Sequence, residues 1–482
     1  SEMCIRDSNY SYDTENLAEI FFPYEKIKMM TNMPQNTESG IIVYTGISDG
    51  MITVCAYIEG VKTEDTVKIE ETQDEKNALS LLFYRVLSKA TGDTYPWGIL
   101  YGVRPARFYH SLADKFSPDY AQKVLRDKFL VSDGKISLVS AVAESENKII
   151  PLSGRNSFSL YVSIPFCPTR CSYCSFVSHS IERAASLLDD YVELLEKELE
   201  ETGRYVKELG LKLETVYFGG GTPTTLSASQ LSRVLGAVER NFDLSQLREY
   251  TVEAGRPDTV TEKKLTVLKS AGVGRISINP QTFNDEVLNV IGRRHTSAQT
   301  LQAYDTAVNC GFENINMDFI AGLPKDTLRS FTNSIETALK LAPSNITVHT
   351  LCLKTGAFMT SHGMPDKALA ADMVEFSRNA LTSAGYKPYY MYRQGKSVGN
   401  LENTGWCTQG HDCLYNVFMM DETHTVLAAG AGAVTRLKNP ENGKIERIYN
   451  YKYPYEYIGH FDEILRRKHK ISDFYKEIVN CS

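Results

Sequence analysis

Residues 159–174 read SLYVSIPFCPTRCSYC, an apolar run followed at once by three cysteines. The run over 159–165 is short and rich in β-branched and aromatic residues, which is typical of a strand. Similar runs recur along the chain, with amphipathic helical patterns between them. The further predicted strands are 215–220, 250–255, 275–280, 315–322 and 345–351. Regular alternation of strand and helix predicts βαβ units and a parallel sheet.

Six such units predict an α/β fold with a partial (β/α)6 barrel rather than a closed one of eight units. The chemistry of such folds lies in the loops at the carboxyl ends of the strands. We expect three domains: an N-terminal α+β extension over 1–150, the barrel over 158–360, and a C-terminal α+β domain over 361–482 that covers the open side of the barrel.

The flanking regions carry weaker patterns. In the N-terminal extension, GIIVYTG and MITVCAYIEG predict a hairpin with its turn at 48–50, followed by a helix that ends at Gly92. The first dozen residues are interpreted as a tail. In the C-terminal region we expect short strands and a helical finish beyond residue 456. The expected strands are KPYYMYRQGK (387–396), CLYNVFMM (413–420), HTVLAAGAGAV (424–434) and KIERIYNYK (444–452).

Composition limits the classes of function. The net charge of −7 and the lack of a Lys/Arg block argue against nucleic-acid binding. The sequence contains no apolar stretch of about 18 residues, so no membrane span is predicted. The polar N-terminus does not resemble a secretion signal. We therefore expect a cytoplasmic location, where thiols stay reduced and clustered cysteines indicate metal rather than disulfides.

Cys167, Cys171 and Cys174 follow the first strand with the spacing C-x3-C-x2-C. Three thiolates on one tight loop can each bind one iron of a [4Fe-4S] cubane, which leaves the fourth iron open. An open iron can chelate the amino and carboxylate groups of S-adenosylmethionine, and one-electron reduction then gives a 5′-deoxyadenosyl radical. The alternative is a structural zinc loop with His179 as fourth ligand.

Polar features recur at the ends of later predicted strands. The segment GGGTPT (219–224) ends the second strand, and its glycines permit close approach of a ligand to the backbone. Glu253 and Asp318 lie at strand ends within apolar runs, where carboxylates need partners to offset their desolvation. A cationic cofactor rich in hydroxyls would supply such partners. The alternative is an ion pair with a nearby arginine: Arg256, Arg275 or Arg293.

The ordered motifs resemble the radical S-adenosylmethionine superfamily, and within it the oxygen-independent coproporphyrinogen III oxidases (coproporphyrinogen dehydrogenases). The resemblance spans roughly residues 158–355 and, through NLENTGW and LAAGAGAV, part of the C-terminal third. The long extension containing YGVRPAR resembles a branch from bacteria with anaerobic lifestyles. The matching signatures are YVSIPFCPTRCSYCSF, VYFGGGTPT, VEAGRPDT, RISINPQTF, VIGRRHT and NMDFIAGLPKD.

The resemblance implies two catalytic residues. Tyr161 would contact the methionine carboxylate or the propionate side of the substrate, and Arg293 would pair with a carboxylate, although its neighbour Arg294 could take that role. Tyr173, inside the cysteine loop, would lie near the adenine.

The resemblance also assigns cofactor-binding roles to residues at the later strand ends. Glu253 would accept a hydrogen bond from the methionine ammonium or the ribose. The residues expected at the methionine amino end are Gly220, Gly221 and Thr222. Those expected at the ribose hydroxyls are Gln281 and Asp318, and those near the adenine are Gly322 and Cys352.

The reaction that the resemblance implies is oxidative decarboxylation of coproporphyrinogen III propionates to vinyl groups in anaerobic heme biosynthesis, with a flavodoxin- or ferredoxin-like electron donor. Two departures leave the substrate open. Phe176 stands where the best-characterised dehydrogenases carry a fourth cysteine, and CLYNVFMM lacks the His-Asn pair of the heme-chaperone branch. The alternatives are a heme-binding chaperone and a radical enzyme that acts on another tetrapyrrole, such as heme.

Three further groups have two interpretations each. Cys407, His411 and Cys413 are either a second metal site or ordinary surface residues. The tyrosines over 386–392, together with Arg393, either line a tetrapyrrole cavity or pack a strand against the barrel. Arg104 and Arg107 are either propionate ligands or surface arginines.

Overall fold

The computed structural model describes residues 2–6, 10–30, 40–69, 74–174, 179–352 and 365–480. The chain forms two compact units. Unit 1 comprises residues 1–143, 352–371 and 391–402, and unit 2 comprises residues 144–351, 372–390 and 403–482. Among the described residues, no helix combines the length and apolar character needed to cross a membrane.

Unit 1 contains a five-stranded sheet of order β2-β1-β3-β4-β5. The predicted hairpin is present, with Ser48 opposite Met51, and positive φ angles at Asp49 and Gly50 give the turn a backbone that suits a two-residue hairpin. The expected tail is corrected at residues 2–6, which form β1 and pair in parallel with β2 and β3. The strands are β1 (Glu2–Arg6), β2 (Lys26–Met30), β3 (Ile41–Ser48), β4 (Met51–Ile58) and β5 (Val61–Lys68).

The helices of the N-terminal region begin and end at recognisable caps. Helix α2 starts at Asp74, whose carboxylate accepts the Lys76 N–H, and stops at Gly92, whose φ of 76° permits the left-handed cap. The buried side chains of α1 and α2 pack against β3 and β4 to form the core of the unit. The helices are α1 (Ser11–Phe21), α2 (Glu75–Thr91), α3 (Pro105–Lys115), α4 (Pro118–Phe129) and α5 (Asp133–Ile149).

An 11-stranded sheet dominates the rest of the chain, in the order β14-β15-β13-β12-β11-β10-β9-β6-β16-β17-β18. Its central six strands are parallel and coincide with the six predicted ones, so the expected barrel is confirmed. These strands are β6 (Ser157–Ile164), β9 (Lys212–Gly220), β10 (Glu249–Glu253), β11 (Arg275–Ser277), β12 (Asn314–Ala321) and β13 (Asn345–Thr350).

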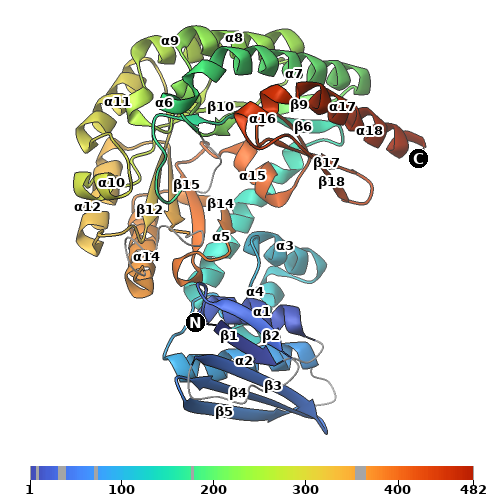
Figure 1. Cartoon of the computed structure of the whole chain (residues 1–482), viewed down its shortest axis with the longest axis vertical. Helices are drawn as coiled ribbons and strands as arrows, with labels where there is room; N and C mark the ends of the chain where they lie inside the picture. Colours follow the sequence, from blue (N-terminus) through green and yellow to red (C-terminus); the bar gives the residue numbers. More distant parts are fainter. Residues whose placement is uncertain are drawn as a thin grey trace. The chain divides into compact units, whose positions relative to one another are not determined.

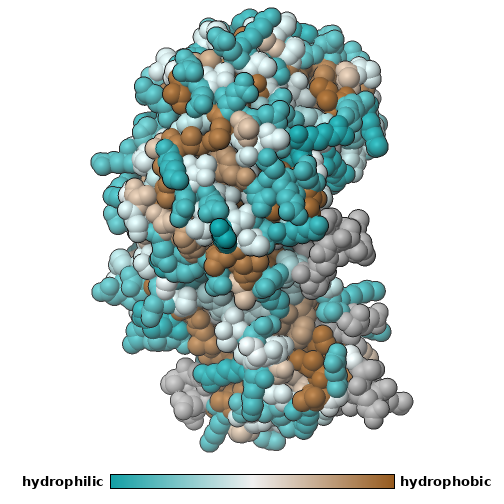
Figure 2. Space-filling model, turned by 90° about the vertical axis from the view of Figure 1, so that its left-hand side faces the viewer, coloured by the Kyte–Doolittle hydropathy of each residue, from teal (hydrophilic) through white to brown (hydrophobic). Residues whose placement is uncertain are grey.

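Helices cover the outer face of this sheet (Figure 1). Their apolar faces are buried, as in α7, where Tyr191, Leu195 and Leu199 are fully buried. The side that carries α10–α12 shows hydrophobic patches among hydrophilic residues (Figure 2). Val308 of α11 and Leu328 of α12 are exposed. The helices are α7 (Leu188–Leu209), α8 (Ala228–Asn241), α9 (Glu262–Ser270), α10 (Asp285–Val290), α11 (Ser297–Asn309), α12 (Leu328–Leu341) and α14 (Lys367–Ser383).

The C-terminal strands extend the barrel sheet instead of forming the expected separate domain over 361–482. Strand β16 pairs in parallel with β6, and β15 pairs antiparallel with β13, because the edges of an open sheet need hydrogen-bonding partners. These strands are β14 (Lys387–Arg393), β15 (Glu402–Cys407), β16 (Thr425–Ala429), β17 (Val434–Lys438) and β18 (Ile445–Tyr449). The expected strand CLYNVFMM is corrected to a helix, α15 (Leu414–Asp421). The helical finish is confirmed as α16 (Pro454–Gly459), α17 (Phe461–Lys468) and α18 (Lys470–Asn480).

A buried carboxylate ties this C-terminal region to α7. Glu198 is fully buried, and Lys468 lies 3.0 Å from its Oε1. The Gly430 N–H and the Tyr457 hydroxyl donate to its other oxygen, at 2.8 and 2.6 Å, and Asn450 donates at 2.7 Å. Because a buried charge is tolerated only when it is paired and hydrogen-bonded, these contacts fix the position of the C-terminal segment.

Candidate active site

The cysteine loop begins where β6 ends. Cys167 is the last residue of the short strand β7 (Phe166–Cys167), which pairs with β8 (His179–Ser180). Cys167 is buried, whereas Cys171 and Cys174 are partly exposed. The predicted position of the three cysteines, at the carboxyl end of the first parallel strand, therefore agrees with the fold.

The glycine turn after β9 supports this loop directly. The backbone N–H groups of Gly221 and Thr222 donate to Ile164 and Phe166, both at 2.8 Å, and the Thr222 hydroxyl lies 3.4 Å from the Cys167 sulfur. A Cβ on Gly221 would lie 2.6 Å from the Phe166 oxygen, so only glycine allows this approach. Gly220, expected at the same ligand, has a φ of 106° that also favours glycine.

Two buried arginines hold the other side of the loop. Arg256 donates to the Thr169 hydroxyl at 3.0 Å, and its Nη1 lies 4.0 Å from the Cys171 sulfur. The carboxylate of Asp258 accepts the Nε and Nη2 N–H groups of that guanidinium, at 3.0 Å each, and so fixes its orientation. Arg293 donates to the Asn279 carbonyl at 2.6 Å and to the Tyr173 hydroxyl at 3.3 Å. The loop is thus braced by cationic groups that can stabilise thiolates.

Glu253 ends β10 and faces the glycine turn. Its Oε1 accepts the Tyr217 hydroxyl at 2.6 Å. Burial, and to a smaller extent the charge of Asp318, raises the pKa of Glu253 to about 7, although the Tyr217 hydrogen bond opposes this shift. The carboxylate is therefore suited to pair with a cation supplied from outside the chain.

Asp318 projects from the middle of β12. Burial acts to raise its pKa, but His349, 3.7 Å from Oδ2, and the Asn316 amide, 2.7 Å from Oδ1, outweigh burial and lower the pKa. Among the described residues, neither carboxylate forms an ion pair with Arg256, Arg275 or Arg293. Arg256 pairs with Asp258, Arg275 with Glu249, and Arg293 with a carbonyl.

Gln281 and Gly322 are near Asp318: Gln281 bonds the backbone of β12, and Gly322 follows the end of that strand. Gln281 is buried and has a φ of 67°, and its backbone bonds both Asp318 and Ile320 of β12. Gly322 follows β12, and its N–H donates to the Met373 sulfur at 3.3 Å. Cys352 belongs to unit 1, where its thiol donates to the Gly395 carbonyl, so its proposed place near the adenine stays a prediction.

Three stacked tyrosines form an aromatic wall next to Glu253. Tyr161 of β6 and Tyr217 of β9 occupy paired positions with ring centroids 6.3 Å apart. Tyr415 of α15 stacks on Tyr217 at 4.4 Å and on Tyr161 at 6.2 Å. The Tyr415 hydroxyl is buried without a hydrogen-bond partner among the described residues. Burial raises the pKa of all three phenols, which stay protonated near neutral pH.

The alternative metal sites find little support in the geometry. Among the described residues, no group of three or more His, Cys, Asp or Glu side chains surrounds a point where a single metal ion could bind. A cubane needs no such point, because each thiolate binds a different iron. The ring of His179, the fourth ligand of the zinc interpretation, packs edge-to-face against the rings of Tyr453 and Tyr455.

Cys407, His411 and Cys413 lie at the opposite end of the barrel. Each side chain has a different partner: Asp412 for Cys407, Asn314 for His411 and Glu249 for Cys413. The interpretation as a second metal site is therefore disfavoured. The Tyr386, Tyr389 and Tyr390 side chains are buried, which agrees with strand packing.

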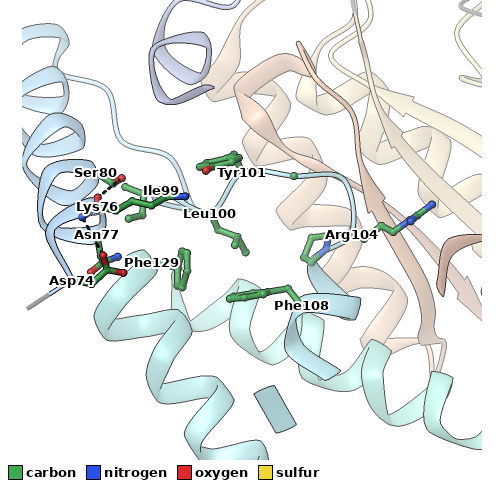
Figure 3. Close-up of a pocket in the computed structure, with 12 residues that line it drawn as sticks. Asp74, Lys76, Asn77, Ser80, Ile99, Leu100, Tyr101, Arg104, Phe108 and Phe129 are labelled. Atoms are coloured by element: carbon green, nitrogen blue, oxygen red, sulfur yellow. Dashed lines mark hydrogen bonds between the residues drawn. The ribbon is translucent and has the colours of Figure 1, made fainter. Parts of the chain in front are cut away.

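Unit 1 contains a separate cavity of about 390 Å³, and Arg104 contributes to its lining. Figure 3 shows the Arg104 side chain extending away from the rings of Phe108 and Phe129, which lie in edge-to-face contact at 5.1 Å. Two polar residues at its rim have structural roles, since Asp74 caps α2 and Lys76 pairs with Asp13. This arrangement does not favour Arg104 as a propionate ligand.

Sequence reasoning missed several residues that complete the site: Arg256 as a brace of the loop, Tyr217, Tyr415, Asn279 and His349. Tyr217 left a usable signal, because it occupies the same position in the second strand as Tyr161 in the first, three residues before the end of each strand. Tyr415 left none, since a tyrosine within an apolar run is typical of a core position. Phe176 lies outside the described residues.

Comparison with known proteins agrees with this architecture. The family model of the radical SAM superfamily matches residues 161–338. The solved structure of coproporphyrinogen III oxidase (HemN) from Escherichia coli is similar in fold, with a TM-score of 0.50 and 23% identity over 67% of this chain and 72% of that one. A parallel partial barrel with a cysteine loop after its first strand defines the chain as a radical SAM protein.

The oxygen-independent coproporphyrinogen-III oxidase-like protein HemZ of Bacillus subtilis is 34% identical, over 97% of this chain and 96% of that protein. The heme chaperone HemW of Lactococcus lactis is 31% identical, over 65% of this chain and 79% of that protein. Within the radical SAM superfamily, the chain therefore belongs to the family of HemN- and HemZ-like coproporphyrinogen oxidases and their relatives.

Proposed function

We propose that this protein is a radical SAM oxidoreductase that converts propionate groups of coproporphyrinogen III into vinyl groups, giving protoporphyrinogen IX. One observation carries the proposal: the cysteine loop and Glu253 lie at the carboxyl ends of parallel strands, and Asp318 of β12 belongs to the same parallel sheet. Similarity to an oxidase-like protein over 97% of the chain, including the N-terminal region, supports the substrate class.

Cys167, Cys171 and Cys174 would hold three irons of a [4Fe-4S] cluster, whose fourth iron would bind S-adenosylmethionine. Together these groups supply, when bound, an alkyl radical strong enough to take a hydrogen atom from a carbon. The chain contributes the braces of the loop. The cationic Arg256 and Arg293 offset the charge of the thiolates, and Thr222 bonds Cys167.

Glu253 would receive the ammonium of the methionine moiety. The N–H groups of Gly221 and Thr222 already hold the cysteine loop, and an ammonium needs acceptors rather than donors. Carbonyl oxygens of the glycine turn would therefore join the Glu253 carboxylate around it. A bound cation lowers the pKa of a carboxyl group, so binding would keep Glu253 ionised.

Asp318 and Gln281 would bind the ribose hydroxyls. The lowered pKa of Asp318 keeps it an acceptor at neutral pH, and the fixed backbone of Gln281 on the neighbouring strand end limits where its amide can lie. The guanidinium of Arg293 donates to the Asn279 carbonyl and the Tyr173 hydroxyl and also interacts with Cys171, and its remaining N–H donors would pair with a carboxylate.

The wall formed by Tyr161, Tyr217 and Tyr415 would pack against the flat tetrapyrrole, since stacked aromatic surfaces suit a macrocycle. The buried Tyr415 hydroxyl would gain a partner from a polar group of the substrate. At each reacting propionate, the substrate would lose a hydrogen atom to the alkyl radical, one electron to an external one-electron acceptor, and carbon dioxide, which leaves a vinyl group.

The alternative is a heme chaperone, because HemW proteins are similar to 48–65% of this chain. The segment that lacks the His-Asn pair of that branch folds as α15, which presents Tyr415 to the aromatic wall instead. A buried tyrosine stacked against two other rings is a poor site for a heme iron ligand.

The test is an anoxic assay of reconstituted protein with reductant, S-adenosylmethionine and coproporphyrinogen III. We expect 5′-deoxyadenosine together with products that have lost one and then two carbon dioxide molecules, identified by mass. Cofactor cleavage without vinyl product would exclude this substrate. Stoichiometric heme binding in a Soret titration would then support the chaperone, and an opened ring on incubation with heme would indicate a different radical reaction.

A further inference from the structure

We infer that a basic and aromatic surface beside the cysteine loop docks an acidic one-electron donor protein. This inference rests on the proposed function, because only a redox cluster in the loop needs such a donor. The docking surface consists of a basic groove and a tyrosine ridge (Tyr451, Tyr453, Tyr455). The groove is lined by Arg447, Ile448, Tyr449, Arg466, Arg467 and Lys470, together with one carboxylate, Glu463.

The groove has a volume of about 370 Å³ and lies between β18 and the helices α17 and α18. Four cationic side chains line it. Glu463 pairs with Arg466 and Arg467, and Glu422 pairs with Arg447 at 3.3 Å, so within the described part of the chain four cations share two carboxylate partners. The Arg466 side chain is 77% exposed. On a chain with a net charge of −7, this groove is a local reversal of sign that attracts an acidic partner.

The ridge follows β18, one wall of the groove, in sequence. Tyrosine occupies every second position from 449 to 457. Tyr457 is buried and anchors the segment to Glu198, whereas Tyr449 and Tyr455 are 57% and 54% exposed. The Arg467 guanidinium lies 4.6 Å from the Tyr451 ring, which holds groove and ridge together. Exposed tyrosines and arginines are the residue types that contribute most to protein–protein binding.

The ridge reaches the cysteine loop through His179. Its ring lies edge-on to Tyr453 at 5.7 Å and to Tyr455 at 6.0 Å. The backbone of His179 pairs with Phe166, and the next residue, Ser180, pairs with Cys167. Arg170, exposed between the first two cysteines, adds a further cation at this end of the surface. A partner seated on groove and ridge would therefore lie against the outer side of the loop.

The chemistry identifies the kind of partner. In the proposed step, the donor is oxidised by one electron and the cluster is reduced by one electron, and no covalent bond forms or breaks. Electron transfer between proteins requires close approach of the two centres, and a transient complex of this kind is steered by complementary charge. An acidic flavoprotein such as flavodoxin fits both requirements.

The experiment compares two reductants on the reconstituted protein. We substitute Arg466→Glu with Lys470→Glu, and as a matched control Arg329→Glu with Lys340→Glu, two exposed cations on α12. Cluster reduction is followed by its absorbance under anoxia, with reduced flavodoxin or with dithionite. With flavodoxin we expect at least a tenfold slower reduction in the groove variant, no change in the control variant, and a wild-type rate that falls with added salt.

With dithionite, which needs no docking, all three proteins should be reduced at the same rate. Equal rates with flavodoxin in wild type and groove variant would overturn the inference, as would equal slowing by both reductants. Calorimetric binding of oxidised flavodoxin gives a second readout that requires no reaction, and the groove variant should bind at least tenfold more weakly. Groove binding of inorganic phosphate without binding of flavodoxin would assign the groove to a small anion instead.

The outcomes separate this inference from the proposed function. Cluster reduction and flavodoxin binding need no tetrapyrrole, so a docking effect without vinyl product would retain the docking surface and reject the substrate. Vinyl product with dithionite, combined with an unaffected groove variant, would retain the substrate and reject the docking surface.

Discussion

The two ends of strand β10 carry the same residue type in opposite circumstances. At its amino end, Glu249 accepts the N–H groups of Leu414 and Tyr415, at 2.9 and 3.2 Å, and lies 3.6 Å from Arg275. At its carboxyl end, Glu253 accepts the Tyr217 hydroxyl, and burial raises its pKa to about 7. Glu249 is thus satisfied by partners from the chain. Ionisation of Glu253 is unfavourable unless a cation binds next to it. This contrast separates a structural end of the barrel from a reactive one.

The largest expected effect comes from replacing one cysteine at each end of the barrel, the reactive end and the structural end. After anoxic reconstitution, Cys171→Ala should lose the cluster absorbance, most of the bound iron and all formation of 5′-deoxyadenosine, because one iron loses its thiolate. Cys413→Ala, at the structural end, should retain all three, since its sulfur contacts Glu249. Iron analysis and product chromatography provide the measurements. A Cys171→Ala protein with normal absorbance and cleavage would contradict the assignment of the loop.

Glu249→Gln should destabilise the fold. The change leaves the buried Arg275 without its counter-charge and weakens the cap of α15, so we expect a loss of about 3 kcal/mol in the free energy of unfolding. Thermal denaturation measures this loss as a lower melting temperature. The affinity for S-adenosylmethionine in the protein that remains folded should be unchanged, and a selective loss of that affinity would place Glu249 in the site.

Glu253→Gln should have the opposite effect on stability. The pKa of Glu253 is raised from 4.5 to about 7, so its stabilising contribution is complete below pH 4.5 and is lost as the pH rises through 7. The ligand-free variant should match wild type at pH 5 and exceed it at pH 8 by on the order of 2 kcal/mol. Its affinity for S-adenosylmethionine should fall at least tenfold.

The wild-type affinity should itself fall as the pH drops below 7, because the protonated carboxyl group no longer attracts an ammonium. Calorimetric titration between pH 5.5 and 8 measures this dependence. A flat profile would show that Glu253 does not bind the cofactor through its charge.

The smallest expected effects distinguish two stacked tyrosines. Tyr217→Phe removes the hydrogen bond that opposes the upward shift of the Glu253 pKa, so the pH profile of cofactor affinity should move to higher pH. Tyr415→Phe removes a hydroxyl without a hydrogen-bond partner among the described residues, so stability should change by less than about 0.5 kcal/mol. A large loss of stability in Tyr415→Phe would mean that its hydroxyl has a partner in the folded chain.

The sequence allowed the six parallel strands and the position of the cysteine loop to be predicted, because both depend on local patterns. The run CLYNVFMM was assigned to the wrong element, since a short apolar run has no period that separates a strand from a helix. Its helical form depends on Glu249, a residue distant in sequence that caps α15. The pairing of β15 and β16 with the edges of the barrel sheet was not predicted either, because pairing between strands distant in sequence has no local sequence pattern.

The buried contact between Glu198 and Lys468 has a consequence for how the protein is made. Helix α7 leaves the ribosome on the order of half a minute before Lys468 is added to the chain. During that interval Glu198 lacks its counter-charge, and β6 lacks its partner β16. We therefore expect the edge of the barrel next to the cysteine loop to stay unpaired until β16 and Lys468 have been synthesised.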